Sequence, residues 1–335
     1  MKIKIAILGA GSFGTAITKL ISSYEKYEVI LWSAVREEIE EIRKNKENVK
    51  YLPGVKIDTD KIFLTTDNLI LKNADIVIFA VASKYVRNVA KKISNYIKKE
   101  AVIVNAAKGL EQESFKRFSQ VIYEETNSKK IVALCGPSHA EEIARFIPTT
   151  IVASCENLRI AEYIQEILSS NIFRVYVNED IIGVEIAAAL KNIMALAVGV
   201  CDGLNLGDNA KAAIMTRGLF EIARLGVFLG AREKTFLGLA GVGDLIVTCT
   251  SEHSRNKKAG FLIGKGVEVK KALEEVNMVV EGYYATKAAY EFSNVNNIYM
   301  PITKELYKIL YEKKDIKMSI SSLMNRKTKH EYEKF

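Results

Sequence analysis

The sequence lacks the marks of a disulfide-bonded, metal-binding or secreted protein. Its four cysteines are widely spaced and form no CxxC pair: Cys135, Cys155, Cys201 and Cys249. This spacing argues against a disulfide framework or a zinc site and fits a reducing cytosol. The chain begins MKIKIAILGAG, which enters a strand at once and leaves no room for a signal peptide. We therefore expect a cytoplasmic protein without a metal site.

Motifs for nucleic acids and membranes are also missing. The net charge is +8, but no RNP-like, zinc-finger or basic-zipper pattern accompanies it, so nucleic acid is not implied. The charge reflects either a lysine-rich solvated surface or a preference for anionic ligands. The longest apolar run, AAALKNIMALAVGV (residues 187–200), is too short to cross a bilayer and carries a lysine. We expect no membrane span.

The first half of the chain instead alternates strand and helix signals. Apolar, β-branched runs without polar alternation are typical of strands that are covered on both faces. Such runs occur at KIAILG, at EVILWS and in residues 74–81, 101–107, 130–136 and 149–155. Helical segments, at residues 14–23, 84–98 and 158–168, lie between them. This alternation predicts an α/β fold with a Rossmann-type, mostly parallel sheet.

Strand signals nearly vanish after FRVYVNED, where Asp180 is a predicted N-cap for a long Ala-rich helix. The later segments read as helices: residues 211–229, 257–263 and 303–313. The change in composition predicts a dinucleotide-binding domain over residues 1–180 and an all-helical substrate and catalytic domain over residues 181–335. No Pro/Ser-rich linker separates the two.

A glycine motif, G-x-G-x-x-G, joins the first strand to the first helix. It is formed by Gly9, Gly11 and Gly14, and this position is the one that dinucleotide binding requires. Gly9 permits the tight turn, Gly11 lets the backbone approach a pyrophosphate, and Gly14 lets helix and strand pack closely. The helix N-terminus then offers its amides to the phosphates. The alternative is a tight turn that binds no ligand.

The second strand ends without the acid that normally binds the ribose hydroxyls of NAD. It reads Leu31-Trp32-Ser33-Ala34, and Arg36 follows. Without a carboxylate, a ribose phosphate is not repelled, and a nearby arginine can bind it. Use of NADP, with or without NAD, is therefore compatible with the sequence. Alternatively, Arg36 is an exposed residue at a helix start.

Lys191 is the only charged residue between Glu185 and Asp202. Burying an ammonium is costly unless it is paired or neutral, and desolvation lowers a lysine pKa toward the range useful for proton transfer. A lysine can also extend to the surface along its alkyl stem. Asn192, beside it, is suited to hold a substrate hydroxyl or merely to satisfy backbone groups.

Two strand ends in the first half carry further candidates. Lys108, in AAKGLE, follows a predicted parallel strand, and ligands bind at this edge of open sheets. Gly136 and Ser138, in CGPSHAEE, also follow a strand and suit close approach to a ligand. His139 in the same stretch is a candidate general base, or else it caps or packs.

A third stretch, GLAGVGDLIVTCTSEHSRN, covers residues 238–256 and follows no strand, so it is not a second dinucleotide motif. Its glycines allow close approach, and Asp244 follows them. Ser254, Arg255 and Asn256 then precede a helical segment. A hydroxyl, a guanidinium and an amide at a helix start suit a phosphate. The alternative is an ordinary capped helix with a surface arginine.

Together these stretches resemble the soluble NAD(P)-dependent glycerol-3-phosphate dehydrogenases of the bacterial type. They follow the family order from residue 5 to about residue 302 and read GAGSFGTA, LW followed by VKYLPG, AAKGLE, CGPSHAEE, AAALKNIMALAVGVCDGL, KAAIMTRGL, GLAGVGDLIVTCTS with SRN, and VVEGY. The combination of these stretches, rather than any one of them, is specific to the family.

The resemblance implies reversible reduction of dihydroxyacetone phosphate to sn-glycerol 3-phosphate with NAD(P)H, which feeds glycerophospholipid synthesis, and it suggests a homodimer. Lys191 resembles the proton acceptor of the oxidation direction, and Lys108 a contact to substrate and cofactor. Asp244 orients Lys191 or binds the substrate hydroxyl. The other implied substrate contacts are Gly136, Ser138, Ser254, Arg255 and Asn256. The other implied cofactor contacts are Ser12, Phe13, Ala140, Arg255, Val279 and Glu281.

One departure and two rival hypotheses remain. Many relatives carry a basic residue where this chain has Ala34, so the preference between NAD and NADP stays open. One rival is another two-domain dehydrogenase, of the β-hydroxyacid or 6-phosphogluconate type, but those enzymes lack the stretch at residues 238–256. The other rival is a non-catalytic dinucleotide sensor, against which Lys108 and Lys191 argue.

Overall fold

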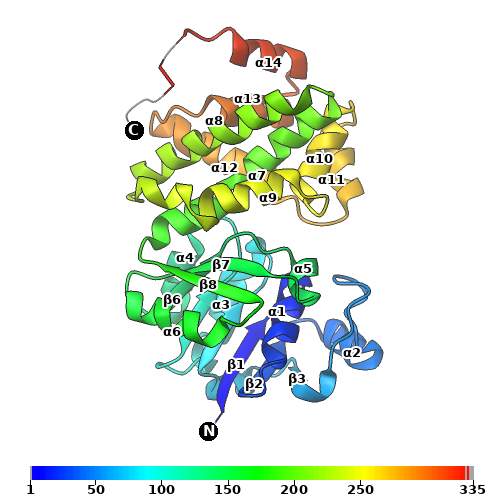
Figure 1. Ribbon diagram of the computed structural model, residues 1–335, viewed down its shortest axis with the longest axis vertical. Helices are drawn as coiled ribbons and strands as arrows, with labels where there is room; N and C mark the ends of the chain where they lie inside the picture. Colours follow the sequence, from blue (N-terminus) through cyan, green and yellow to red (C-terminus); the bar gives the residue numbers. More distant parts are fainter. Residues whose placement is uncertain (1, 329, 332–335) are drawn as a thin grey trace. The chain divides into compact units, whose positions relative to one another are not determined.

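The structure, a computed structural model, describes residues 2–328, 330 and 331 (Figure 1). The chain forms two compact units. The first consists of the residues up to Glu111 together with Lys116–Ile181, and the second of Gln112–Phe115 together with the residues from Ile182 onward. The short segment Gln112–Phe115, which belongs to the second unit, is the main difference from the domain bounds predicted by composition.

The first unit is built on an eight-stranded sheet with strand order β3-β2-β1-β4-β5-β6-β7-β8 (Figure 1). All neighbouring strands are parallel except β6 and β7, which are antiparallel. The prediction of a Rossmann-type, mostly parallel sheet is thus confirmed. The strands are β1 (Ile3–Leu8), β2 (Tyr27–Trp32), β3 (Ile62–Thr65), β4 (Ile76–Phe79), β5 (Val102–Asn105), β6 (Ile131–Cys135), β7 (Thr149–Ser154) and β8 (Phe173–Asn178).

Both faces of this sheet are covered, as the uninterrupted apolar runs predict. In β1, Ile5 and Ile7 belong to one hydrophobic layer, whereas Ala6 and Leu8 belong to the other. This division follows from the two-residue period of a strand. The helices that contribute to the first layer are α1 (Ser12–Ser22), α2 (Arg36–Asn45), α5 (Ala140–Ala144) and α6 (Leu158–Leu168). Those of the second layer are α3 (Val86–Ile93) and α4 (Phe118–Thr126).

The edge strand β3 is absent from the sequence prediction, and its position explains why. It pairs with β2 alone and spans four residues, and its Phe63 side chain is 55% exposed. Its apolar run, residues 62–64, is only three residues long, shorter than the runs that mark the inner strands. A run of this length does not by itself predict a strand.

The second unit is helical, and no strand occurs between residues 182 and 328. Helix α7 begins directly after Asp180, the predicted N-cap. The helices are α7 (Ile181–Gly203), α8 (Gly207–Phe228), α9 (Asp244–Thr250), α10 (Arg255–Gly264), α11 (Val269–Val276), α12 (Glu281–Val295), α13 (Pro301–Glu312) and α14 (Ile316–Met324). The prediction of a helical second half is confirmed.

Helix α7 is the core element of this unit. Among the described residues it is the one helix long and apolar enough to span a bilayer, but 94% of its most apolar window is buried inside the protein. A helix that is apolar all round and covered on all sides by protein is typical of the core of a large domain.

Helices α7 and α10 pack backbone against backbone. A Cβ atom on Gly199 would lie 2.1 Å from the carbonyl oxygen of Lys257, and one on Gly260 would lie 2.0 Å from that of Leu196. Any side chain at these positions would separate the helices. The start of α10 is therefore held against the helix that carries Lys191.

A buried carboxylate joins α8 to the start of α13. Glu221 is 2% exposed, and its carboxylate accepts hydrogen bonds from the backbone N of Ile302 at 2.6 Å, the backbone N of Thr303 at 3.0 Å and the Thr303 hydroxyl at 2.9 Å. Burial raises the pKa of Glu221 to about 7, although these hydrogen bonds act in the opposite direction. The side chain thus satisfies amides that the first turn of α13 leaves without a helical partner.

We expect Glu221→Ala to lower the free energy of unfolding by roughly 1–3 kcal/mol, because buried donors lose their acceptor. The raised native-state pKa predicts a pH signature. The contribution of Glu221 to the free energy of unfolding is fully present below its unfolded-state pKa of about 4.5. It is lost as pH rises through its folded-state pKa of about 7. Urea unfolding should therefore show a larger difference between wild type and variant at pH 5 than at pH 8. An equal difference at both pH values would contradict this assignment.

Candidate functional site

The glycine motif forms the turn between β1 and α1, and each glycine has a distinct geometric reason. Gly9 has φ +108°, a conformation that favours glycine. A Cβ on Gly14 would lie 1.9 Å from the Gly9 carbonyl oxygen, so helix and turn meet too closely for any side chain. A Cβ on Gly11 would have no atom within 4 Å. Neither the φ angle of Gly11 nor its packing requires glycine. A ligand that approaches the backbone at this position would require it, because a side chain would occupy the same space.

A buried asparagine that the sequence analysis missed holds this turn. Asn48 is 3% exposed, and its Nδ2 donates to the Ala10 carbonyl at 2.7 Å and to the Thr15 hydroxyl at 2.7 Å. It lies 38 residues from Ala10 in the chain, so no local pattern identifies it. The predicted cofactor contacts Ser12 and Phe13 are the first residues of α1.

At the end of β5, Lys108 joins the residues that follow β6. Its Nζ donates to the Gly136 carbonyl at 2.9 Å and contacts the Ser138 hydroxyl at 3.3 Å, and that hydroxyl donates to the same carbonyl at 2.8 Å. Gly136 has φ +131°, which favours glycine. We call these three residues the Lys108 cluster. His139 and Ala140 follow as the N-cap position and first residue of α5.

In the helical unit, the ammonium of Lys191 is buried and paired. Lys191 is 5% exposed, and its Nζ donates to Asp244 Oδ1 at 2.5 Å and to the Thr248 hydroxyl at 2.7 Å. Asp244 is 1% exposed, and its backbone carbonyl accepts a bond from Thr248 at 2.6 Å. The side chain therefore does not extend to solvent. We call Lys191, Asp244 and Thr248 the Lys191 cluster.

Two features of α9 position this cluster. Asp244 and Thr248 stand four residues apart on one helical face, so both reach Lys191. The preceding residues, Leu239–Gly243, form a π-helical turn, a feature common at functional sites. A Cβ on Gly241 would lie 1.9 Å from the Phe236 carbonyl oxygen. This glycine therefore allows close packing within the protein rather than approach of a ligand.

A neighbouring thiol does not compete for proton transfer. Burial raises the pKa of Cys249 to about 12, although the nearby charge of Lys191 acts to lower it. The thiol is therefore neutral near pH 7. All four cysteines are free and buried.

The amides of Asn192 and Asn256 bind each other. Asn256 Nδ2 donates to Asn192 Oδ1 at 2.9 Å, and Asn256 Oδ1 accepts from the backbone N of Gly282 at 2.8 Å. A Cβ on Gly282 would lie 2.4 Å from the Asn192 carbonyl oxygen, so α12 begins in direct contact with α7. The predicted cofactor contacts Val279 and Glu281 lie at this start of α12.

The start of α10 is both a capped helix and an exposed cationic position. The hydroxyl of Ser254, 4% exposed, accepts from the backbone N of Lys257 at 3.3 Å, which makes Ser254 the N-cap. Arg255 is the first residue of the helix and is exposed. Ser254 therefore caps the helix, as the alternative of an ordinary capped helix predicts. The exposed side chain of Arg255 is nevertheless accessible to a ligand.

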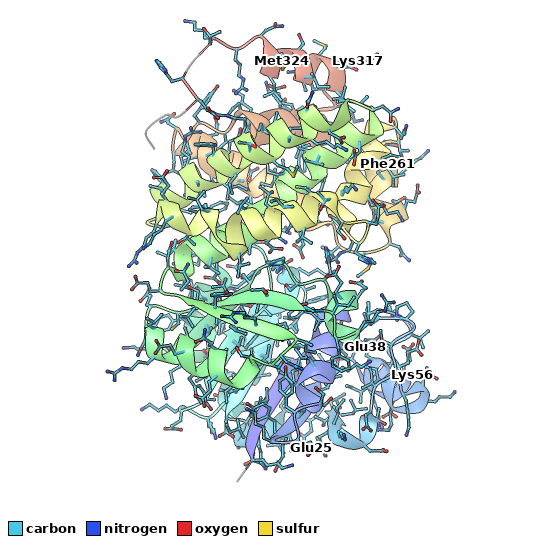
Figure 2. All side chains as sticks on the ribbon, in the orientation of Figure 1. Glu25, Glu38, Lys56, Phe261, Lys317 and Met324 are labelled. Carbon is cyan, nitrogen blue, oxygen red and sulfur yellow. The ribbon has the colours of Figure 1, made fainter. Side chains whose placement is uncertain are left out.

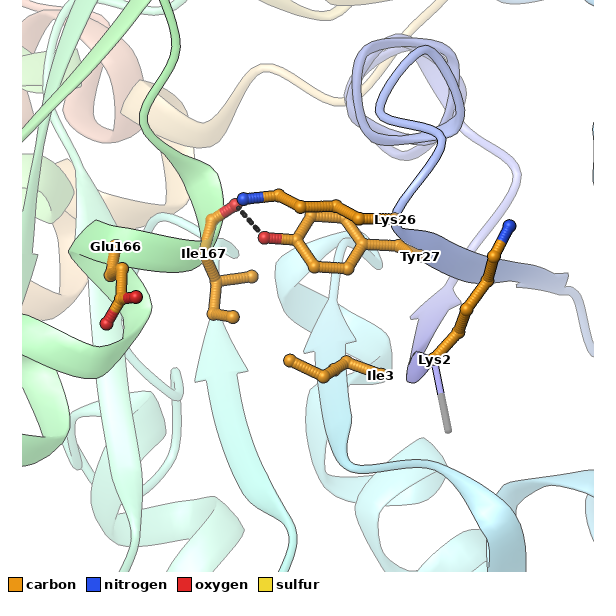
Figure 3. Close-up of a pocket in the computed structure, with 6 residues that line it drawn as sticks. All are labelled: Lys2, Ile3, Lys26, Tyr27, Glu166 and Ile167. Carbon is orange, nitrogen blue, oxygen red and sulfur yellow. Dashed lines mark hydrogen bonds between the residues drawn. The ribbon is translucent and has the colours of Figure 1, made fainter.

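A pocket elsewhere contains none of the predicted site residues. It lies at the amino ends of β1 and β2, where the Tyr27 hydroxyl donates to the Ile167 carbonyl at 2.9 Å (Figure 3). Ligands of open α/β sheets bind at the opposite edge, beyond the carboxyl ends of the strands. The glycine turn and the Lys108 cluster lie at that carboxyl edge.

The chain matches two family models. The model for the N-terminus of NAD-dependent glycerol-3-phosphate dehydrogenase matches residues 4–161, and the model for its C-terminus matches residues 180–321.

Individual relatives agree with these matches. A protein of Enterococcus faecalis named glycerol-3-phosphate dehydrogenase [NAD(P)+] is 49% identical over 99% of this chain and 98% of its own length. One of the same name from Moorella thermoacetica is 49% identical over 99% of both chains. The crystal structure of glycerol-3-phosphate dehydrogenase from Coxiella burnetii has a TM-score of 0.91 and 34% identity, covering 97% of this chain and 99% of its own.

Proposed function

Because the chain belongs to the NAD-dependent glycerol-3-phosphate dehydrogenase family, we propose that Lys191 transfers the proton of that reaction. The enzyme interconverts dihydroxyacetone phosphate and sn-glycerol 3-phosphate with NAD(P)H, and its product provides the backbone of glycerophospholipids. The 49% sequence identity to enzymes of this name extends over almost the whole chain. It therefore disfavours both alternatives, the hydroxyacid-type dehydrogenase and the non-catalytic sensor.

The glycine turn fits the cofactor. The open space at Gly11 allows phosphate oxygens to approach the backbone, and the N-terminus of α1 supplies amides and partial positive charge. Ser12, Phe13 and Gly14 would lie along the phosphates. When bound, NAD(P)H supplies the hydride. We also propose Ala140, Val279 and Glu281 as cofactor contacts.

In the reduction, Lys191 donates a proton to the ketone oxygen, where negative charge develops, and in the oxidation it takes the hydroxyl proton. The pairing with Asp244 at 2.5 Å and with Thr248 at 2.7 Å supports this role, since both contacts hold Nζ in one position. This buried, two-point attachment is the observation that carries the proposal.

Lys108 adds a second positive charge to the reaction. Its contacts with Gly136 and Ser138 hold Nζ at the carboxyl edge of the sheet, where the family resemblance implies contact with substrate and cofactor. We propose that Gly136 and Ser138 contact the substrate as well as orient this lysine.

The phosphate of the substrate is bound at the start of α10. Arg255 is exposed at the first helical position, where a guanidinium and the helix dipole both favour an anion. Ser254 caps the helix, and Asn256 with Asn192 fixes its register on α7. Binding energy gained at this remote group then positions the ketone.

Arg255→Ala should lower kcat/KM for dihydroxyacetone phosphate by roughly ten- to hundredfold, the scale of one charge-assisted contact. Steady-state assays measure it, with Lys258→Ala, an exposed lysine on the same helix, as the charge-matched control. With unphosphorylated dihydroxyacetone the difference between wild type and Arg255→Ala should be smaller, because that substrate has no phosphate for Arg255 to bind. Unchanged kcat/KM for the phosphorylated substrate would place the anion site elsewhere.

The activity itself is tested by following the absorbance of NADH and of NADPH in parallel. Oxidation that depends on dihydroxyacetone phosphate is the expected result. In the reverse assay, reduction of NAD+ or NADP+ by a β-hydroxyacid or a 6-phosphosugar acid, rather than by sn-glycerol 3-phosphate, would indicate a different dehydrogenase. We further propose a homodimer from the family resemblance and a cytoplasmic location from the four free, buried cysteines.

A further inference from the structure

At the end of β2, helix α2 supplies the carboxylate that the strand itself lacks. Ser33, the residue after β2, is 3% exposed, and its hydroxyl donates to Glu38 Oε2 at 2.6 Å while accepting from the backbone N of Val35 at 3.1 Å. Glu38 is partly buried and lies on α2 (Figure 2). The two hydrogen bonds fix the Ser33 hydroxyl, and this hydroxyl in turn holds the Glu38 carboxylate in place.

This carboxylate stands at the edge of the sheet that carries the glycine turn. Leu8 pairs with Trp32 in the parallel register of β1 and β2, and the backbone N of Gly9 donates to the Trp32 carbonyl at 2.8 Å. Ser33 is therefore the residue beside Gly9. In dinucleotide-binding folds this end of the second strand faces the adenosine ribose.

The charges around this position oppose a ribose phosphate. Glu37 and Glu38 both occupy the first turn of α2, where the helix dipole favours anions and where a phosphate would otherwise be stabilised. A carboxylate fixed at hydrogen-bonding distance from Ser33 would repel a phosphate there but accept a bond from a free ribose hydroxyl.

Three cations near this position, Arg36, Lys92 and Lys50, are placed less directly than the acid. The side chain of Arg36 is 81% exposed and lies 3.9 Å from Glu40 on the same helix. Lys92 Nζ lies 5.4 Å from the centre of the Trp32 ring, and Lys50 Nζ lies 4.8 Å from that of Tyr51 and interacts electrostatically with Glu38. None of these ammonium and guanidinium groups is fixed at the strand end as Glu38 is.

We propose that Glu38, held by Ser33, selects a dinucleotide with an unphosphorylated adenosine ribose, so that NADH is the preferred cofactor. This inference rests on the proposed dinucleotide site at the glycine turn. It assigns to Arg36 a surface role rather than the binding of a 2′-phosphate.

The test is direct binding, without turnover. Isothermal titration of ADP-ribose and of 2′-phospho-ADP-ribose into wild type should show at least about tenfold tighter binding of ADP-ribose, the scale expected when like charges are juxtaposed. Glu38→Gln keeps an acceptor for Ser33 but removes the charge, and it should abolish most of this preference. Glu37→Gln, with the same change in net charge on the same turn, should retain it.

Two further variants separate the contributions. Ser33→Ala releases Glu38 and should weaken the preference, whereas Arg36→Ala should leave it in place. Equal or tighter binding of the 2′-phosphorylated ligand by wild type would overturn the inference, as would equal effects of Glu37→Gln and Glu38→Gln. Failure of wild type to bind either ligand would contradict the dinucleotide site itself. Circular dichroism of each variant verifies that it is folded.

Discussion

Replacement of Lys191 by alanine is expected to reduce kcat by about 10²–10⁴-fold or more, the usual contribution of a positioned general acid or base. The ketone oxygen would lose its proton donor, while Lys108 and the phosphate contact at Arg255 would be unchanged. The measurement is NADH oxidation at saturating dihydroxyacetone phosphate. Because the lost interaction develops only in the transition state, kcat should change more than KM.

The controls separate chemistry from folding. The structure places the carboxylate of Asp244, 1% exposed, in contact with the Lys191 ammonium, so the substitution leaves a buried charge without its partner. We therefore expect a less stable variant and assay it well below its melting temperature. Partial rescue of turnover by a small primary amine would support proton transfer. Near-wild-type turnover of the folded variant would defeat the assignment.

The sequence identified Lys191 as an anomaly, but not how it is accommodated. A lone ammonium in an apolar helix signals either a partner or an exposed head group, and local sequence does not distinguish the two. The partners lie 53 and 57 residues further along the chain. Asp244 was named through the family resemblance, whereas Thr248 was missed, although its spacing of four residues from Asp244 on a helix would have indicated it.

Polar residues near a helix start also have internal uses that a sequence does not reveal. Ser254 and Asn256 were predicted to bind substrate, and in the structure the hydroxyl caps α10 while the amide joins Asn192 to Gly282. These bonds do not exclude ligand contacts, since an amide has several donor and acceptor sites. They show that each side chain is needed for the local fold as well.

Some structural features depend on tertiary contacts and cannot be predicted from the local sequence. Gln112–Phe115 belongs to the helical unit, where the Phe115 ring stacks on that of Phe292 with centroids 4.3 Å apart. Phe115 has φ +57°, an unfavourable value for a bulky residue, which the surrounding contacts must maintain. The segment ESFK contains neither glycine nor asparagine to mark such a turn.

The same reasoning applies to the acid at the end of β2. The strand reads LWSA, without a carboxylate, so a motif search finds none. The acid comes from Glu38, five residues beyond Ser33, because the turn into α2 returns that side chain to the strand end. Conversely, the glycine turn was predictable in detail, since its geometry is local.

The buried pair of Lys191 and Asp244 should show strong coupling in stability. Lys191→Met and Asp244→Leu each leave one buried charge without its counter-ion, and each should lower the free energy of unfolding by about 3–5 kcal/mol. The double variant leaves neither charge and should be less destabilised than either single variant, since apolar replacement of a whole buried pair is often neutral or stabilising. Urea unfolding of the four proteins, followed by circular dichroism, gives the coupling.

The kinetics of the same four proteins separate the role of the pair in folding from its role in catalysis. The double variant should recover stability but not turnover, because an apolar pair restores packing and supplies no proton. Recovery of stability without activity would show that the chain retains a costly buried ion pair for catalysis rather than for folding. Additive losses in the free energy of unfolding would instead mean that the two side chains do not stabilise each other, and the short Nζ–Oδ1 contact of 2.5 Å would then have no energetic counterpart.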